Sequence, residues 1–498
     1  MKAIKLIAAS ARTIRAGAIF DANMAPARPA LAAITALLLA ATLAPAAQAT
    51  DLLQAWQAAQ SHDRELAVAR ATQATALPQR EQATALWRPG VALTAAAGLA
   101  TGETDTRGAQ FAAPGFGQST GVDFATSVTG GTATRVALQA SQPLYNPERR
   151  AQQQQLGLQA DQTDLQWQAA QQAAMLRTAQ RYFDLAVAQE ALRVIDGQLD
   201  AVRKMATEAQ DRFDIGSAPI TDTHEAQARL AQLQAQRLAA QADLDIKRRQ
   251  LADSTGMPPA ALTARLPGHG EPATTHALQV WQQEAEAGNP AIRLQQLAAR
   301  IAQAEADKHA SAAAPKLDLV AQAAQDRLSG SGDYGSGARN KNLNAMVGVQ
   351  LTVPLYTGGW RSAKQEEALR RWEQAQAQVD STREQVAQQV HAAWLGLQLG
   401  AQRVHALMQA LTASEARQDA TLTGHEVGHR TLLDVLNADN DTAATRLALA
   451  QARSELLLNQ LRLSQLAGQL DEAALQRANQ MLDTPSNQSR PSGLLSTK

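Results

Sequence analysis

The chain has 498 residues, no cysteine, and equal numbers of basic and acidic side chains, 46 of each. Its zero net charge gives no reason to expect the basic surface that binds nucleic acid, so no nucleic acid is predicted as a partner. Only 3% of the residues are aromatic, whereas Ala and Gln fill long tracts. This composition favours long, thin helices over a bulky globular core.

Residues 1–49 are predicted to be a signal peptide. Basic residues precede an apolar run from Leu31 to Leu43, which is too short to cross a bilayer as a helix. Ala47-Gln48-Ala49 then supplies the small residues of a cleavage site. Met1 and Met24 both remain candidate start residues. For an exported chain without cysteine we expect neither a disulfide nor a cysteine-linked lipid anchor.

The mature chain is predicted to contain one structural repeat twice, over 50–270 and 271–475. Gln142-Pro143-Leu144-Tyr145 returns as Val353-Pro354-Leu355-Tyr356, and Gly216 and Asp222 return as Gly428 and Asp434. The shift of about 210 residues is far longer than a solenoid period, so it indicates a duplicated, domain-sized module.

Each repeat is predicted to contain one strand hairpin, at 89–145 and at 315–356. In the second hairpin every other residue from Leu343 to Leu355 is apolar, with Asn344, Gln350 and Thr352 among the polar residues between them. Such alternation is typical of a strand with one apolar and one polar face. The segments 100–131 and 329–342 are rich in Gly, Ser, Thr or Asp, and we expect them to be loops. A half-buried strand in a soluble sandwich is the alternative interpretation.

Long helices are predicted between and after the hairpins. Residues 51–87 are expected to be helical up to Pro89, and the segment from Glu148 to Phe213 contains no proline. At 1.5 Å per residue such a helix is about 100 Å long. The expected helices are 147–213, 221–253, 360–423 and 431–470, which should pack as coiled coils. The tail, 476–498, is expected to be disordered.

Four strands per chain set a condition on any membrane role. In a bilayer every backbone amide and carbonyl must be paired, so a spanning sheet has to close into a barrel. Closure takes at least about eight strands. The sequence therefore predicts an oligomer that shares one barrel.

The motifs resemble those of the TolC family of outer-membrane channel proteins. The resemblance covers about 50–475 and lies in Val353–Gly359, in Val427–Leu436, and in the first-repeat segments Arg212–Gly216 and Ile220–Asp222. It implies a mainly α protein with a membrane β-barrel, in which a homotrimer shares 12 strands in outer-membrane lipid and a helical tunnel crosses the periplasm.

The same resemblance implies passive export of proteins or small molecules, with a periplasmic adaptor (membrane fusion protein) and an inner-membrane ABC or RND-type transporter as partners. The lack of a lipidation cysteine resembles the type I secretion branch more than many drug-efflux members. No cofactor, metal or catalytic residue is expected. No glycine-rich phosphate loop occurs in the sequence, so the energy is expected to come from the partner.

The resemblance also implies a gate at the tunnel tip. By motif position, Arg430 would contact Thr221 and Asp222, and Asp434 would contribute to a ring of carboxylates at the entrance. Two positions depart from the family pattern: His425 replaces a common tyrosine in the gate, and Asn437 replaces a second acidic residue in the ring. An ordinary exposed ion pair, worth less than about 1 kcal/mol, is the alternative interpretation of Arg430 with Asp222.

Two other functions remain to be weighed. His425-Glu426-Val427-Gly428-His429 matches the zinc-peptidase motif, in which two histidines one helical turn apart bind zinc and the glutamate acts as a base. Glu455 is the candidate third ligand, although Gly428 corresponds to Gly216 at a predicted turn. A soluble periplasmic coiled-coil adaptor would explain the helices and the signal peptide, but not the two hairpins.

Overall fold

A computed structural model describes residues 50–115, 117–268, 276–333 and 335–482. The predicted signal peptide and the predicted repeat boundary at 270 lie outside these residues. Within them, no helix is at once long and apolar enough to cross a membrane. The elements, in chain order, are α2 (Leu52–His62), α3 (Arg64–Gln73), α4 (Ala76–Ala85), β1 (Gly90–Ala113), β2 (Gly117–Tyr145), α5 (Pro147–Asp214), α6 (Ile220–Thr255), η1 (Pro259–Ala261), α7 (Leu278–Gly288), α8 (Pro290–Ser311), β3 (Lys316–Gly332), β4 (Gly335–Thr352), α9 (Trp360–Glu426), α10 (Leu432–Leu466) and α11 (Glu472–Gln480).

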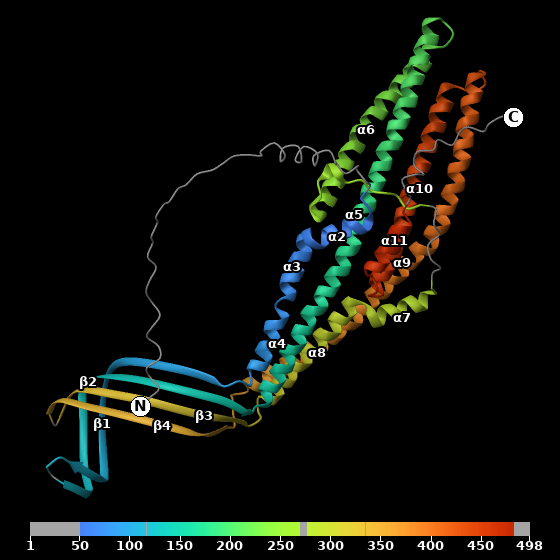
Figure 1. The fold of residues 1–498 in the computed structure, drawn as a ribbon. Coiled ribbons are helices and arrows are strands. Elements are labelled where there is room, and N and C mark those ends of the chain that lie inside the picture. The colour runs from blue at the N-terminus through green and yellow to red at the C-terminus, as the bar shows by residue number, and fades with distance from the viewer. Residues whose placement is uncertain (1–49, 116, 269–275, 334, 483–498) are drawn as a thin grey trace, which may run out of the picture. The chain divides into compact units, whose positions relative to one another are not determined.

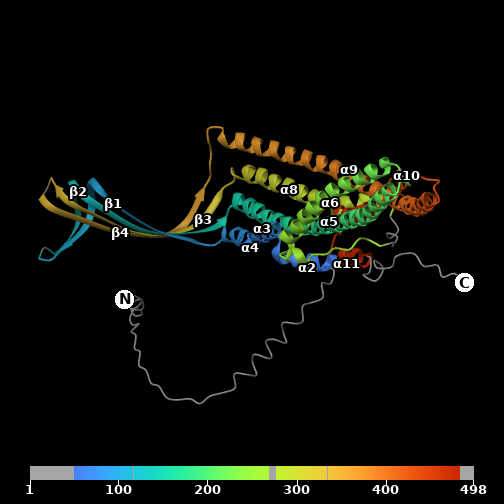
Figure 2. The same ribbon diagram turned by 90° about the horizontal axis from the view of Figure 1, so that it is seen from above.

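The same order of elements occurs twice along the chain. Short helices lead into a strand hairpin, the hairpin leads into a helix of 68 residues (α5) or 67 residues (α9), and a helix of about half that length returns. In both views α5 and α9 run away from the sheet (Figures 1 and 2). The turns that follow α5 and α9 lie at the end of the helices far from the sheet (Figure 1).

The four strands form one antiparallel sheet in the order β1-β2-β3-β4. The prediction that 100–131 and 329–342 are loops is wrong, because strands extend through most of both segments. Their Gly and Ser content suggested loops, but cross-strand backbone hydrogen bonds hold these residues extended. The predicted extension of the second hairpin to 356 is also wrong, since β4 ends at Thr352. Pro354 follows closely and has no N–H to donate to a neighbouring strand.

The sheet has an apolar and a polar face, as the alternation predicts. The apolar face is exposed in the single chain: Val347 is 76% exposed and Leu93 is 70% exposed. On the polar face, Ala137 and Ala324 lie side by side and are almost buried. The apolar face comprises Val91, Leu93, Leu99, Val136, Leu138, Leu319, Leu343, Val347, Val349 and Leu351. The polar face carries Arg135, Gln139, Gln322, Asp326, Asn342 and Asn344.

The hairpin of β1 and β2 continues beyond the ends of β3 and β4 and bends away from them (Figure 1). At the bend, β2 crosses close to β3: a Cβ atom on Gly332 would lie 1.8 Å from the carbonyl oxygen of Ser127. The Ser127 hydroxyl accepts a hydrogen bond of 2.9 Å from the backbone N–H of Asp333. Glycine is therefore required where the two strands cross.

The segment 51–87 is helical, as predicted, but it forms three helices rather than one. Asp63 ends α2 and caps α3, accepting a hydrogen bond of 3.0 Å from the backbone N–H of Leu66. Arg177 of α5 donates to the Asp63 carboxylate at 2.8 Å and to Glu65 at 2.5 Å. Burial raises the pKa of Asp63, but the bonds from Arg177 and Leu66 outweigh it and hold that pKa below its usual value. The break thus fastens the short helices to α5.

Among the described residues, the largest core cluster joins α2 and α11 to the middle of α5. Trp56 of α2, Tyr182 and Phe183 of α5, Leu251 of α6 and Leu475 of α11 are almost fully buried in it. Pro267 and Leu482 form a backbone bridge beside this cluster. The prediction that the chain is disordered from 476 is therefore wrong up to 482, since α11 buries its apolar side chains against α2. Residues 483–498 lie outside the described residues.

Two leucines of α6 offer a matched test of this core. Leu251 is 1% exposed and belongs to the cluster, whereas Leu238 is 68% exposed. Leu251→Ala is expected to cost about 2–5 kcal/mol, because it removes buried methyl groups and leaves a cavity. Leu238→Ala is expected to change stability by about 0.5 kcal/mol at most. Thermal midpoints measured by circular dichroism in detergent compare the two; equal midpoints would contradict the assignment of the core.

Candidate functional site

The two far turns are built alike around a glycine. After α5, Gly216 takes a φ of 72°, and the backbone N–H of Ser217 donates to the Arg212 carbonyl at 2.8 Å. After α9, Gly428 takes a φ of 80°, and the N–H of His429 donates to the Gly424 carbonyl at 2.8 Å. A side chain is disfavoured at these left-handed positions, so glycine fixes where each helix stops.

Thr431 and Asp434 form a reciprocal cap at the start of α10. The Asp434 N–H donates to the Thr431 hydroxyl at 3.2 Å, and the Thr431 N–H donates to the Asp434 carboxylate at 3.0 Å. Hydrogen bonding of the carboxylate to the backbone N–H and to the hydroxyl of Thr431, together with the nearby charge of Arg430, holds the pKa of Asp434 below its usual value. The carboxylate predicted for the entrance ring is thus fixed at the turn as an anion down to acidic pH.

The two helical hairpins are packed together just behind their turns. Leu432 and Leu436 of α10 are buried in one cluster with Val202 of α5 and Leu233 of α6. Farther back, Asp439 accepts hydrogen bonds from Gln198 of α5 at 3.0 Å and from Gln418 of α9 at 2.8 Å. Apolar packing and this shared carboxylate therefore hold the first and second copies of the motif beside each other.

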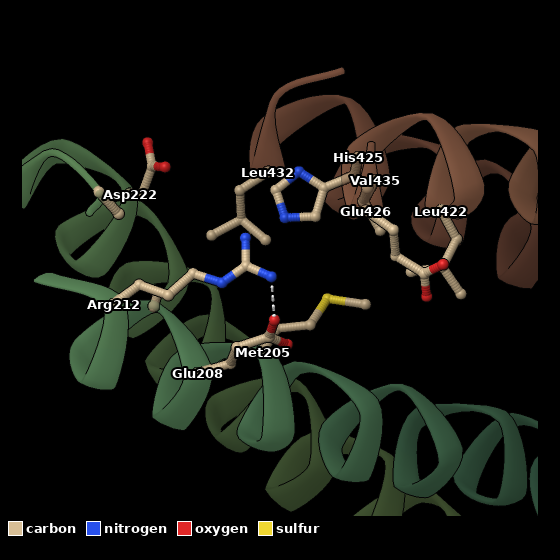
Figure 3. A pocket seen from close by; sticks show the side chains of 11 residues that line it. Met205, Glu208, Arg212, Asp222, Leu422, His425, Glu426, Leu432 and Val435 are labelled. Carbon is tan, nitrogen blue, oxygen red and sulfur yellow. Dashed lines mark hydrogen bonds and ion pairs between the residues drawn. The ribbon is translucent and has the colours of Figure 1, made fainter. Parts of the chain in front are cut away.

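A small cavity of about 90 Å³ lies between the two turns (Figure 3). Asp222, His425 and Arg212 all line it, and Arg212 is bonded to Glu208 at 2.5 Å. The His425 Nδ1–H donates to the Arg430 carbonyl at 3.0 Å, which orients the ring from the side of the turn. The site thus combines a carboxylate, a guanidinium and an imidazole within one small space.

The structure brings together only some of the predicted gate residues. Asp222 and His425 share the cavity, whereas Thr221, Arg430 and Asn437 are exposed. Among the described residues, no hydrogen bond or ion pair within the single chain joins Arg430 to Thr221 or Asp222. The contact of Arg430 with those two residues therefore stays a prediction, as does the entrance ring of Asp434 and Asn437.

Arg212 and Glu208 are cavity residues that the sequence analysis did not assign to the site. Arg212 is the first residue of the first copy of the turn motif, ten positions before Asp222. Its place in the repeated motif could therefore have indicated that it belongs to the site. Glu208 lies four residues earlier and pairs with Arg212 along the same helix face. Glu426, the glutamate of the zinc-peptidase motif, also lines the cavity.

The zinc-peptidase interpretation fails on backbone geometry. Zinc binding by this motif requires both histidines on one continuous helix, but α9 ends at Glu426 and the chain turns at Gly428 before His429. Glu455, the candidate third ligand, pairs with Arg403 at 3.2 Å. In the part of the chain that is described, no group of three or more His, Cys, Asp or Glu side chains is placed to hold a metal ion.

This geometry predicts the outcome of a metal-binding experiment. Purified protein dialysed against zinc is expected to keep no stoichiometric metal, and Glu426→Gln is expected to change neither zinc content nor any trace peptidase activity. Plasma emission spectroscopy and a peptide-cleavage assay measure both quantities. One bound zinc per chain, with an activity that disappears in Glu426→Gln, would instead support the enzyme.

Comparisons with known proteins agree with this architecture. The family model described as "Outer membrane efflux protein" matches residues 55–257 and 281–469. The chain is 28% identical over 366 residues to outer membrane protein TolC of Escherichia coli (71% of this chain and 73% of the relative). It is 26% identical over 344 residues to the alkaline protease secretion protein AprF of Pseudomonas aeruginosa (68% and 70%).

A solved structure shares the fold at low sequence identity. The outer membrane protein VceC of Vibrio cholerae aligns with a TM-score of 0.65 and 20% identity, over 84% of this chain and 96% of that one. Membership of one family therefore explains the helical hairpins, the four-stranded sheet and the motif turns together. The chain belongs to the outer membrane efflux protein family, a family of outer-membrane export channels rather than enzymes.

Proposed function

We propose that three copies of the chain form one channel, in which each copy contributes four strands to a closed 12-stranded barrel. The supporting observation is the sheet of four strands, in which β1 and β4 are unpaired edge strands and one face is apolar and exposed. Four strands are too few to close, and an open edge in lipid leaves backbone groups unpaired. Pairing β4 of one copy with β1 of the next removes every edge.

The position of the apolar residues supports tilted strands in this barrel. On β4 the apolar residues run from Leu351 outward to Leu343. On β1 they begin at Val91, which cross-strand pairing aligns with Val347, four residues outward of Leu351. The band therefore shifts by four residues, about 13 Å, across three strand spacings of about 14 Å. That offset corresponds to a tilt of about 40°, within the range of outer-membrane barrels.

The dimensions fit a bilayer. Leu343 to Leu351 spans about 27 Å along the strand, hence about 20 Å along the membrane normal at this tilt, close to the apolar belt of such barrels. Trp87, Tyr145, Tyr356 and Trp360 lie where the sheet joins the helices, as aromatic residues do at a bilayer interface. The face with Arg135, Gln139 and Gln322 would line the water-filled interior.

The long helices would continue this conduit into the periplasm. At 1.5 Å per residue, α5 and α9 are each about 100 Å long, and they meet the rest of the bundle through mostly small side chains. We infer passive export, with an inner-membrane transporter of ABC or RND type and a periplasmic adaptor as partners. The names of AprF and of the proteases secretion protein PrtF of Dickeya chrysanthemi favour protein secretion as the first candidate.

Drug efflux is the second candidate, because another relative is named outer membrane efflux protein BepC in Brucella suis. The two candidates differ in cargo, not in the architecture of the channel. Deletion of the gene followed by proteomics of the culture medium and by drug-susceptibility assays separates them. Loss of a secreted protein supports the first candidate; increased drug sensitivity alone supports the second.

The trimer predicts how the protein behaves on extraction. Membranes washed with carbonate should retain it, and detergent-solubilised protein should have the light-scattering mass of three chains. The reason is that a closed barrel buries its apolar face in lipid, whereas a coiled-coil adaptor has no such face. A water-soluble monomer released by carbonate would overturn the proposed channel and favour the adaptor.

We place the gate at the two far turns and assign Arg430, Thr221, Asp222 and His425 to it, with Asp434 and Asn437 at the entrance. Because Arg430 is exposed and has no ion pair among the described residues of its own chain, its partner carboxylate is assigned to Asp222 of a neighbouring copy. Charge-assisted contacts of this kind would hold the three tips together and keep the entrance narrow.

Removing both partners should open the channel. Arg430→Ser combined with Asp222→Ser is expected to raise single-channel conductance in planar bilayers severalfold, because the contact between copies is lost. Arg403→Ser with Glu455→Ser is the matched control, since this exposed pair joins α9 and α10 away from the turns at 3.2 Å. Unchanged conductance in the first variant, or an equal rise in the control, would remove this gate.

A further inference from the structure

Three basic side chains gather on the apolar face of the sheet at its outer end. Arg327 of β3 is paired with Lys341 of β4, and Arg339 lies two residues farther along β4, opposite Ser329. Alternate residues of a strand share a face, so all three point to the same side as Leu343 and Val347. We call Arg327, Arg339 and Lys341 the basic rim.

The charges of the basic rim are not neutralised by the chain. All three side chains are exposed, and among the described residues none of them forms an ion pair or a side-chain hydrogen bond. The nearest carboxylate in sequence, Asp326, points to the polar face and pairs with Arg135 at 3.7 Å. The rest of the row through Arg327 and Lys341 consists of Thr134 and Ala97, which carry no charge.

The basic rim directly borders the apolar band. Lys341 is two residues beyond Leu343, the last apolar residue of β4 on this face, so the two side chains are about 7 Å apart along the strand. Arg339 is two residues farther outward along β4 than Lys341. The opposite end of the sheet joins the helices, so the basic rim lies at the end that faces the cell surface.

From this position we propose that the basic rim binds phosphorylated headgroups of the lipid in the outward-facing leaflet. The proposal rests on the barrel described under Proposed function. Arg327 and Arg339 offer planar forks of donors that match phosphate oxygens, and Lys341 adds a compact charge between them. Three such cations within about 10 Å suit a headgroup that carries more than one phosphate.

A membrane lipid fits this surface better than a soluble acidic ligand. The apolar band immediately below holds acyl chains, so one lipid molecule satisfies both the band and the basic rim. A soluble anion would use only the three charges, which are spread on a convex, water-exposed surface. The energetic gain for a charge at an anionic membrane surface corresponds to about fivefold in affinity per Lys or Arg.

The test uses the full-length trimer in neutral detergent. Its probes are an acylated glucosamine disaccharide that carries two phosphates and the same lipid with both phosphates removed, and native mass spectrometry measures the fraction bound. The triple variant Arg327→Gln, Arg339→Gln, Lys341→Gln is expected to bind the phosphorylated lipid about a hundredfold more weakly than the unaltered protein. The dephosphorylated lipid should bind both proteins equally and weakly.

The control variant removes the same total charge from the helices: Arg203→Gln, Arg370→Gln, Arg383→Gln. Equal weakening in this control, equal binding of the two lipids by the unaltered protein, or no loss in the triple variant would each overturn the proposal. Displacement of the lipid by millimolar inorganic phosphate would show that a free anion suffices and would also overturn it. A triple variant that stays trimeric and conducting but binds lipid normally refutes the basic rim alone, and leaves the proposed channel intact.

Discussion

The unpaired edges of β1 and β4 set the condition on which the rest of the molecule depends. Each edge presents a row of backbone N–H and C=O groups, and beside them lies a face whose leucine and valine side chains are exposed in the single chain. Neither surface is tolerable alone: in water the apolar face associates, and in lipid the edges stay unpaired. The proposed assembly around a common axis would satisfy both at once, and it would place the helices of all copies around one conduit.

At the end of the helices far from the sheet, a few residues decide where each helix stops and starts. Two glycines in the left-handed conformation stop helices of 68 and 67 residues, and a Thr431–Asp434 cap starts the return helix. These local devices bring Asp222, Arg212 and His425 to one cavity. Because each device depends on a few residues, the tips can be altered without disturbing the distant core around Trp56 and Tyr182.

Long helices and strand faces were predictable because their signals are periodic. The absence of proline before Phe213 predicted the long helix, and the alternation of apolar and polar residues around Val347 predicted the apolar face of the strand. Strand length was not predictable in the same way, since Gly- and Ser-rich residues such as those before Gly131 stay extended only through pairing with a neighbouring strand. The break at Asp63 likewise depends on Arg177, which is more than a hundred residues away in sequence.

By itself, the sequence determined the duplication, the order of elements, the family resemblance and the type of each side chain at the turns, because these are carried by local pattern and motif spacing. Only the tertiary structure decided that Arg212 and His425 line one cavity, and that α11 packs against α2. The physical reason is that these facts concern contacts between distant segments, which form when the helices pack and leave no periodic trace in the chain.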